Sequence, residues 1–220
     1  MANQIATVNG IAIASIANIN GITDANLAKL NGREFTSVLP EAHTLIATAT
    51  ASASATLSFT TGIDSTYDAY EFRWTNMHPS SDTVNFQFQV NASGETDFNE
   101  TMTTTYFRAG KNETTTSAFV AYTESEDQAQ GTAYQRIGHL TGSDSDQSTS
   151  GVLTLYAPSS TTYVKHFVSM SNTAHAADFS KASHVAGYIN TTAAIDEISF
   201  AFQSGNIDAG QIKMYGIAKA

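Results

Sequence analysis

The sequence contains no cysteine, only three prolines and one tryptophan, and few charged residues. Without cysteine the chain can form neither a disulfide framework nor a thiolate metal site, so its stability must come from core packing and association. Charged residues make up 14% of the 220 positions, against about a quarter in an average protein. The net charge of -10 argues against binding to nucleic acids and to anionic membranes, because both need a basic surface.

Long hydrophobic runs are also missing from the sequence. No stretch approaches the roughly 18 apolar residues of a membrane-spanning helix, and the first residues lack the basic segment and continuous apolar run of a signal peptide. We therefore expect the chain to be made in a bacterial-type cytoplasm. In place of charge the sequence is rich in Ser, Thr, Ala and Asn. Because Thr favours β-strands, this composition suits a sheet protein better than a helical one.

The first 36 residues carry a hexapeptide that occurs three times, at a spacing of eleven residues. The copies are Ile5–Gly10, Ile16–Gly21 and Leu27–Gly32, with the pattern (Ile/Leu)-Ala-x-(Val/Ile/Leu)-Asn-Gly. An eleven-residue period is compatible with an apolar stripe along a helix, but a glycine inside a helix costs about 1 kcal/mol and Asn-Gly is a turn signal. We therefore predict short helical or extended pieces, each closed by its Asn-Gly turn, with Thr23–Leu30 as a helical candidate.

Each repeat offers too few aliphatic side chains to fold by itself. Burying one such side chain gives about 1.5–3 kcal/mol, and ordering each residue costs a comparable amount. Residues 1–36 are therefore predicted to be an arm for oligomerisation and docking, since repeats that cannot bury their faces singly usually stack. The alternative is a disordered tail with a chance bias in composition. The predicted docking residues are Ile5, Val8, Ile11, Ile16, Ile19, Ile22, Leu27 and Leu30, and the turn glycines are Gly10, Gly21 and Gly32.

Residues 37–54 form a second region, dominated by small side chains. Within it Ala alternates with Ser or Thr from residue 47 onward. Such a tract is either a flexible linker or a strand, because a period of two places all the alanines on one face. The alternation alone does not separate these two interpretations.

Residues 55–220 show a succession of short strand patterns without a sustained helical period. Tyr70, Phe72 and Trp74 share one face, and this spacing predicts that Trp74 is buried. Val84–Val90 is the cleanest amphipathic strand, with Val and Phe on one face and Asn and Gln on the other. About eleven such strands, separated by turn residues, predict an all-β, jelly-roll-like antiparallel sandwich that follows the small N-terminal repeat arm.

Patterns for metal binding are weak. The six histidines form none of the paired spacings of zinc sites, and we interpret them as surface or strand residues. The segment from Asp144 resembles the start of a calcium loop, but Thr149 and Leu155 replace the Gly and Glu of an EF-hand. A polar turn is the preferred interpretation, with a calcium site built from loop oxygens as the alternative. We predict no metal and no cofactor.

Patterns for catalysis are weak as well. No nucleophile elbow, phosphate loop or dinucleotide fingerprint occurs, and the nearest acid pairs, such as Asp97 with Glu100, have no supporting context. We therefore predict that the protein is not an enzyme. Tyr67 and Tyr106 are the candidate ligand-facing aromatic residues, with a host-surface glycan as the candidate ligand.

Three segments carry a resemblance to a known class of proteins. The N-terminal hexapeptides resemble short repeats of tailed-bacteriophage virion proteins, including tail-fibre-like and capsid-decoration proteins. Tyr67–Phe72 and the closing Lys213–Lys219, which follows Ile198–Phe202, are similar to strands of phage jelly-roll domains.

The resemblance implies a homotrimeric structural protein on the virion. Its N-terminal part would dock on other virion proteins, such as the major capsid or tail proteins, and its sandwich would project from the particle. The length favours a capsid decoration (cement) protein or a short fibre. The alternative function is a receptor-binding tail fibre or carbohydrate-binding module.

Overall fold

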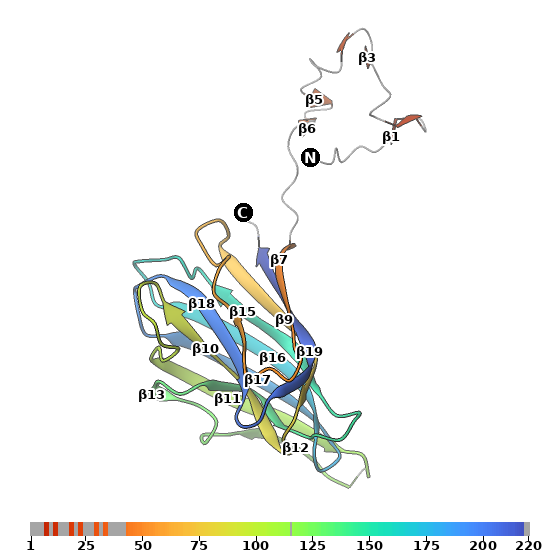
Figure 1. Ribbon diagram of the computed structural model, residues 1–220, viewed down its shortest axis with the longest axis vertical. Helices are drawn as coiled ribbons and strands as arrows, with labels where there is room; N and C mark the ends of the chain where they lie inside the picture. The colour runs from red at the N-terminus through yellow and green to blue at the C-terminus, as the bar shows by residue number, and fades with distance from the viewer. Residues whose placement is uncertain are drawn as a thin grey trace. The chain divides into compact units, whose positions relative to one another are not determined.

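The computed structural model describes residues 43–114 and 116–217, together with six two-residue strands within the first 42 residues (Figure 1). All regular structure among these residues is β-strand. The chain divides into two compact units, Met1–Ala42 and His43–Ala220. The unit boundary therefore falls at residue 43, inside the region that the sequence left as a linker or a strand.

The first unit contains three minimal antiparallel hairpins, one for each hexapeptide. They pair β1 (Thr7–Val8) with β2 (Ile11–Ala12), β3 (Asn18–Ile19) with β4 (Ile22–Thr23), and β5 (Lys29–Leu30) with β6 (Arg33–Glu34). In each case the two residues between the paired strands are Asn-Gly, the sequence that most strongly favours a two-residue hairpin connection. The described residues of each repeat are thus extended, and the other repeat residues lie outside the described part of the chain.

The helical candidate Thr23–Leu30 is wrong, because Thr23 lies in β4 and Lys29–Leu30 forms β5. The physical reason is that the dipeptide Asn-Gly favours a two-residue hairpin connection more strongly than the end of a helix. Other predicted arm residues lie outside the described part of the chain: Ile5, Ile16, Leu27, Gly10, Gly21 and Gly32.

Over residues 43–114 and 116–217 the second unit contains thirteen strands. They are β7 (His43–Thr50), β8 (Leu57–Phe59), β9 (Ala69–Pro79), β10 (Val84–Ala92), β11 (Met102–Asn112), β12 (Ala118–Tyr122), β13 (Ala129–Gly131), β14 (Gln135–Thr141), β15 (Thr149–Tyr156), β16 (Lys165–His175), β17 (Phe179–Ile189), β18 (Ile195–Phe202) and β19 (Ile207–Ile217). All their pairings are antiparallel.

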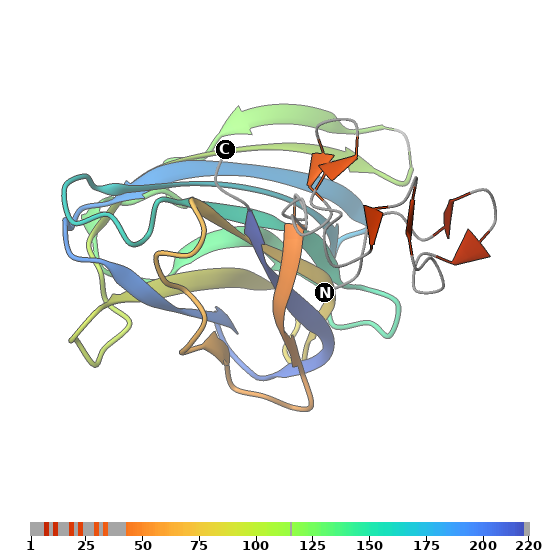
Figure 2. The ribbon, with the colours of Figure 1, turned by 90° about the horizontal axis from the view of Figure 1, so that it is seen from above.

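Eight of these strands form two layers in jelly-roll order. One layer runs β7-β19-β9-β15, and the other runs β8-β18-β10-β14. The first strand of the unit thus lies beside the last, as in a double-sheet jelly roll. The predicted all-β, jelly-roll-like sandwich is confirmed (Figure 2).

The remaining strands are insertions that widen one layer. The segment containing β11, β12 and β13 lies between β10 and β14, and the β16–β17 hairpin lies between β15 and β18. Beyond β15 the first layer continues through β16, β17, β11 and β12. The two layers meet at one side through a single pairing of Thr141 with His175. We refer to β16, β17, β11 and β12 as the added strands.

Aromatic side chains fill the space between the layers. Trp74 of β9 contacts Phe86 of β10 with ring centroids 5.6 Å apart. Phe88 meets Phe167 of β16 edge to face at 4.9 Å. Trp74 is 1% exposed, so the predicted burial of Trp74 is confirmed. Such pairs add about 0.5–1.5 kcal/mol to the gain from apolar burial.

The small-residue region is a strand over part of its length. Residues 43–50 form β7, which pairs with β19 along its whole length. Ala47 and Ala49 pack against the core, while Thr48 and Thr50 are exposed. The strand interpretation is therefore confirmed for residues 43–50, and residues 37–42 lie outside the described residues.

The amphipathic strand Val84–Val90 is confirmed as β10, but its polar face is also covered. Gln89 is fully buried, and its Nε2 donates to the carbonyl oxygens of Glu100, Thr132 and Ala133 at 3.0–3.1 Å. The inserted segment supplies all three acceptors. An amide can be buried in this way because its hydrogen bonds replace those to water.

Candidate functional site

The outer face of the added strands is the most distinctive surface of the sandwich. Strand pairing aligns outward side chains in rows that run across β15, β16, β17, β11 and β12. The middle row is Val152, Met170, His184, Phe107 and Tyr122; the two flanking rows are Thr154, Val168, Ala186 and Thr105, and Ser150, Asn172, Ala182, Ala109 and Val120. None of these residues is Asp, Glu, Lys or Arg. We call this surface, with Tyr156 at its margin, the uncharged face.

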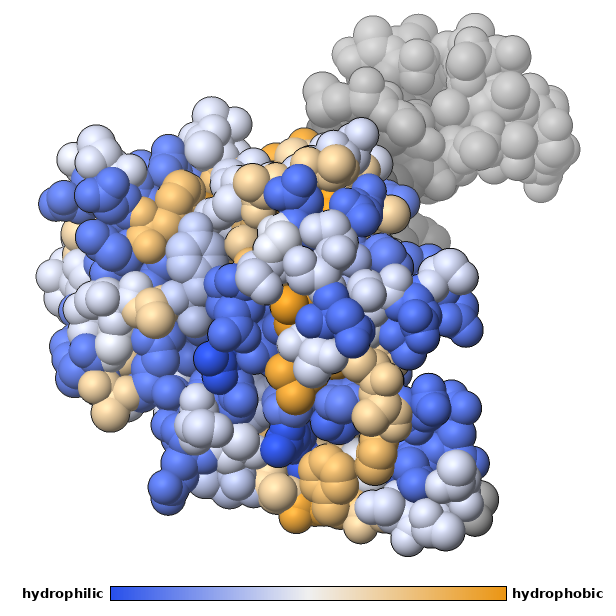
Figure 3. Space-filling view, turned by 60° about the horizontal axis from the view of Figure 1, so that its bottom comes forward, coloured by the Kyte–Doolittle hydropathy of each residue, from blue (hydrophilic) through white to orange (hydrophobic). Residues whose placement is uncertain are grey.

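Large apolar side chains stand exposed on the uncharged face. Met170 is 52% exposed, Val168 49% and Val120 79%. Val168 and Met170 line a groove of about 390 Å³, together with Phe107, Tyr156 and neighbouring residues of four strands. Figure 3 shows how apolar groups form patches within a largely hydrophilic surface. Contiguous exposed apolar patches of this kind mark interaction surfaces.

Charge returns one strand away from this face. The middle row continues from Val152 to Arg73 of β9 and then to Lys213 of β19. Arg73 forms an ion pair with Glu71 and lies over the Tyr215 ring, 5.0 Å from its centroid. The boundary between charged and uncharged surface therefore runs between β9 and β15.

The edge strand next to the uncharged face, β12, also lacks charged side chains. Within the part of the chain that the structure describes, β12 pairs only with β11. Its sequence, Ala-Phe-Val-Ala-Tyr, has none of the lysines or prolines that usually protect an exposed edge. Phe107 and His184 stack beside it, with ring centroids 4.8 Å apart and planes inclined by 5°.

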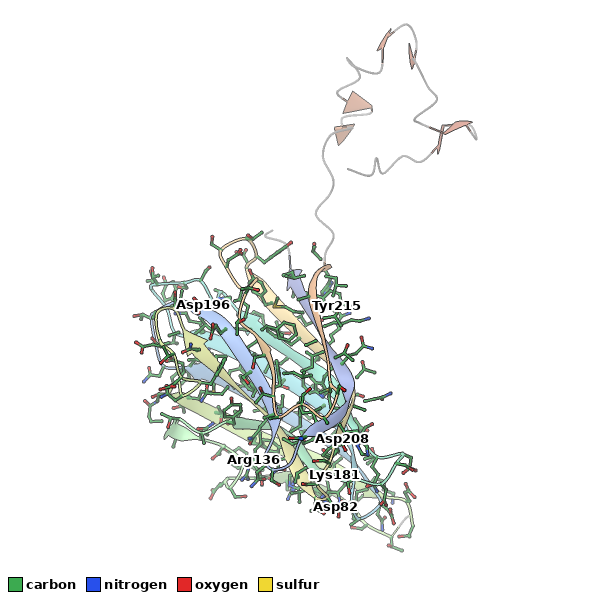
Figure 4. The ribbon with its side chains drawn as sticks, in the orientation of Figure 1. Asp82, Arg136, Lys181, Asp196, Asp208 and Tyr215 are labelled. Carbon is green, nitrogen blue, oxygen red and sulfur yellow. The ribbon has the colours of Figure 1, made fainter. Side chains whose placement is uncertain are left out.

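Beneath the added strands lies a buried cluster of basic groups. Arg108 contacts the His139 imidazole, and the Lys181 Nζ lies 3.5 Å from Nδ1 of the same ring. The rings of His139 and His175 stack with centroids 6.0 Å apart. Glu126 lies 3.9 Å from His139, but it also pairs with Arg136 at 2.6 Å. Figure 4 shows Lys181, Arg136 and Asp82 toward one end of the sandwich, away from Asp196 and Tyr215.

Burial and neighbouring charge keep both histidines neutral at pH 7. Burial first, and then the charges of Arg108 and Lys181, lower the pKa of His139 to about 3. Burial, Lys181 and Arg108 lower the pKa of His175 to about 4, against a smaller opposing effect of Asp82. The Ala177 N–H donates to His175 Nδ1, so the proton of the neutral ring is on Nε2. Acid would destabilise this cluster, because protonation of either histidine would place a positive charge beside those of Arg108 and Lys181.

We expect the free energy of unfolding to fall as the pH is lowered from about 6.5 to about 4. Over this range the unfolded chain binds protons that the folded chain excludes, so each histidine removes about 1.4 kcal/mol per pH unit at full effect. Urea unfolding at several pH values measures the slope. His139→Gln should flatten it, because this change removes one of the two buried imidazoles. An identical slope for His139→Gln would contradict the assignment.

The two aromatic residues predicted to face a ligand do not form a site. Tyr106 is fully buried and donates to the Ser183 Oγ at 2.7 Å, and burial raises its pKa to about 12. The prediction for Tyr106 is therefore wrong. Tyr67 is half-buried and packs edge to face on Tyr70 at 5.7 Å, against the core. The exposed aromatic residues that sequence reasoning missed are Phe107, Tyr122, Tyr156 and Tyr163.

The segment after Asp144 forms a turn, in which the Gln147 N–H donates to the Asp144 carbonyl at 2.8 Å. Among the described residues no group of three His, Asp or Glu side chains is placed to hold a metal ion. No helix long and apolar enough to cross a membrane occurs among them either.

Comparisons of the chain with protein-family models, with curated proteins and with solved structures gave no match. The functional argument therefore depends on the surfaces described above.

Proposed function

We propose that this chain is a self-associating structural subunit of a bacteriophage particle, either a capsid decoration protein or a short fibre. In this proposal the arm of residues 1–36 docks onto neighbouring subunits or other virion proteins, and the sandwich stays exposed. The resemblance of the repeats to those of phage virion proteins makes a trimer the expected assembly. The observation that carries the proposal is the set of three minimal hairpins, one from each repeat.

A hairpin of this size is not a stable structure by itself. Each has two paired residues on either side of its turn, and two of the three pair an aliphatic residue with another, Val8 with Ile11 and Ile19 with Ile22. An isolated two-stranded hairpin is marginal in water, because ordering each residue costs about 1–2 kcal/mol. A supporting surface must therefore supply the missing burial, and three tandem hairpins strengthen each other once the first is bound.

The fold of the second unit is compatible with this role. Jelly rolls are common in viral capsid and lectin domains, although a fold alone does not define a function. The alternative, a glycan-binding module, has less support, because Tyr106 is buried and Tyr67 is half-buried against the core. Glycan and other small-ligand sites also need polar groups fixed beside the apolar surface, and the exposed rings of Phe107 and Tyr122 lie on a face without Asp, Glu, Lys or Arg.

Truncation tests the proposal. We expect a chain lacking residues 1–36 to keep the circular dichroism spectrum of a β-sandwich, because all thirteen strands of the second unit begin at or after His43. Self-association should weaken by at least about tenfold, the loss that corresponds to about 1.4 kcal/mol of buried aliphatic surface. Multi-angle light scattering over a range of concentrations measures it.

A full-length variant distinguishes the effect of the aliphatic side chains of the hairpins from the effect of shortening the chain. Val8→Asn, Ile19→Asn and Leu30→Asn together remove one aliphatic residue from each hairpin. The matched control changes polar positions of the same hairpins, Thr7→Asn, Thr23→Asn and Lys29→Asn. The proposal requires the first variant to dissociate and the control to behave like the unmodified chain. Equal association of all three would rule out the arm as the docking element.

A further inference from the structure

We propose that the uncharged face is a subunit interface, covered in the assembly by a second copy of this chain. This inference rests on the proposed self-association and places part of it on the sandwich rather than in the arm alone. It is carried by the distribution of charge, by the residue types of the face and by the free edge of β12.

The distribution of charge on the chain favours a second copy as the partner of this face. The chain has 20 acidic and 10 basic residues and a net charge of -10, so two copies repel each other through most of their surface. The aligned rows of the uncharged face contain one histidine, His184, and no Asp, Glu, Lys or Arg. A strongly basic partner would be recognised through carboxylates, and a strongly acidic one through Lys or Arg, and these rows contain none of these residues. A second copy, by contrast, meets least repulsion here.

The size of the face sets how much a partner must cover. Five strands spaced about 4.8 Å apart are about 19 Å across, and the three rows span four residue steps of about 3.3 Å, which is about 13 Å. The projected area is therefore about 250 Å², and the side chains that stand off the sheet add accessible surface to it. Each partner of a standard interface buries roughly 800 Å², so a second copy that covers the face also contacts the surface around it, including the edge strand β12.

The residue types fit an interface core. Interface cores are depleted in charged residues and enriched in aromatic residues and Met, and the middle row contains Met170, Phe107 and Tyr122. The adjoining edge strand, β12, has 79% of Val120 and 54% of Tyr122 exposed. An apolar edge strand without charges can pair with a strand of another chain through its free N–H and C=O groups. A partner that covers the face is therefore expected to cover this edge as well.

Met170→Glu in the full-length chain tests the inference. A glutamate in the middle row, at the position opposite His184, would lose its hydration when a second copy covers the face, and we expect the association constant to fall about 100-fold. The matched control is Leu45→Glu, because Leu45 is 51% exposed against 52% for Met170 and lies on the same sheet outside the uncharged face. This control should change association by less than about threefold. Sedimentation equilibrium measures both constants, and equal values for the two variants would overturn the inference.

Thiol labelling gives a second test that does not require a charge to be introduced, which could itself unfold the chain. Since the chain has no cysteine, Met170→Cys introduces a single reactive group. Its rate of reaction with a maleimide should be at least tenfold slower at concentrations where the chain is associated than after dilution, which is the protection that about 90% association provides. Leu45→Cys should react at the same rate in both conditions. A rate at position 170 that does not depend on concentration would contradict the interface.

The outcomes separate this inference from the proposed function. If deletion of residues 1–36 abolishes association while Met170→Glu does not, the arm is the docking element and the inference about the face fails. If Met170→Glu abolishes association while the deletion does not, the face is confirmed and the proposed role of the arm fails. Loss of association in both variants supports both.

Discussion

Replacing Phe200 with alanine is expected to lower the free energy of unfolding by about 3–5 kcal/mol. Phe200 of β18 is fully buried and joins the two layers. Its ring lies 5.7 Å from Phe72 of β9, and on its own layer 6.0 Å from Phe86 and 6.4 Å from Phe88. Truncation removes apolar contact with both layers and leaves a cavity that rigid strands cannot close, so the cost lies at the upper end for a single substitution.

Urea unfolding at a fixed protein concentration measures this effect. The matched control is Tyr163→Ala, which removes an aromatic ring that is 73% exposed and should cost less than about 0.5 kcal/mol. A loss of less than about 1 kcal/mol for Phe200→Ala would show that the two layers do not share the core described here.

Gly151→Ala is expected to cost at least about 3 kcal/mol, although it adds one methyl group. Gly151 lies in β15 between β9 and β16, and a Cβ atom there would come within 2.5 Å of the Met170 carbonyl oxygen and 2.6 Å of the Trp74 ring. It would also approach the Ser171 Cα to 2.8 Å. Because two of these neighbours are backbone atoms in the strand next to Gly151, the sheet itself must shift.

The control for this prediction is Gly131→Ala. A Cβ atom at Gly131 would meet only the side chain of Gln128, whose amide oxygen lies 2.4 Å away and can rotate aside. Thermal unfolding followed by circular dichroism should show a much larger fall in Tm for Gly151→Ala, at about 2–4 °C per kcal/mol for a chain of this size. Similar Tm values for the two variants would contradict the close approach at Gly151.

Local patterns in the sequence predicted most of the strands. Alternation identified β9, where Tyr70, Phe72 and Trp74 all face the core, and it identified the jelly-roll class of fold. The three-residue strand β13 is too short for alternation to be read. The widening of one layer could not be predicted from the sequence either. It depends on the pairing of β11 with β17 across more than sixty intervening residues, and no local pattern indicates a pairing partner so far along the chain.

The candidate site depended on a choice that the sequence leaves open. On β11 the inward residues include Met102, Thr104 and Tyr106, and the outward ones include Thr105 and Phe107. Each face thus carries threonine and an aromatic ring. Since a shift of one residue exchanges the two faces of a strand, the pattern could not tell which aromatic residue is buried. Pairing with β17 decides it, and places Tyr106 in the core and Phe107 on the uncharged face.

One signal in the sequence was available but incomplete. The second face of β10 carries amides rather than charges, and Gln89 is buried under the inserted segment. The same absence of charge marks the outward residues of β16 and β12. Lack of charge on the second face of a strand is therefore a signal that this face can be covered. Residues of the same chain cover Gln89, whereas the uncharged face is exposed in the structure.

Sedimentation equilibrium of the unmodified full-length chain, across a range of concentrations at neutral pH, tests most directly whether this molecule is built to associate. The account predicts a species whose mass is a whole multiple of 23.4 kDa, three times that value if the assembly is the expected trimer. A mass of 23.4 kDa at every concentration would contradict it.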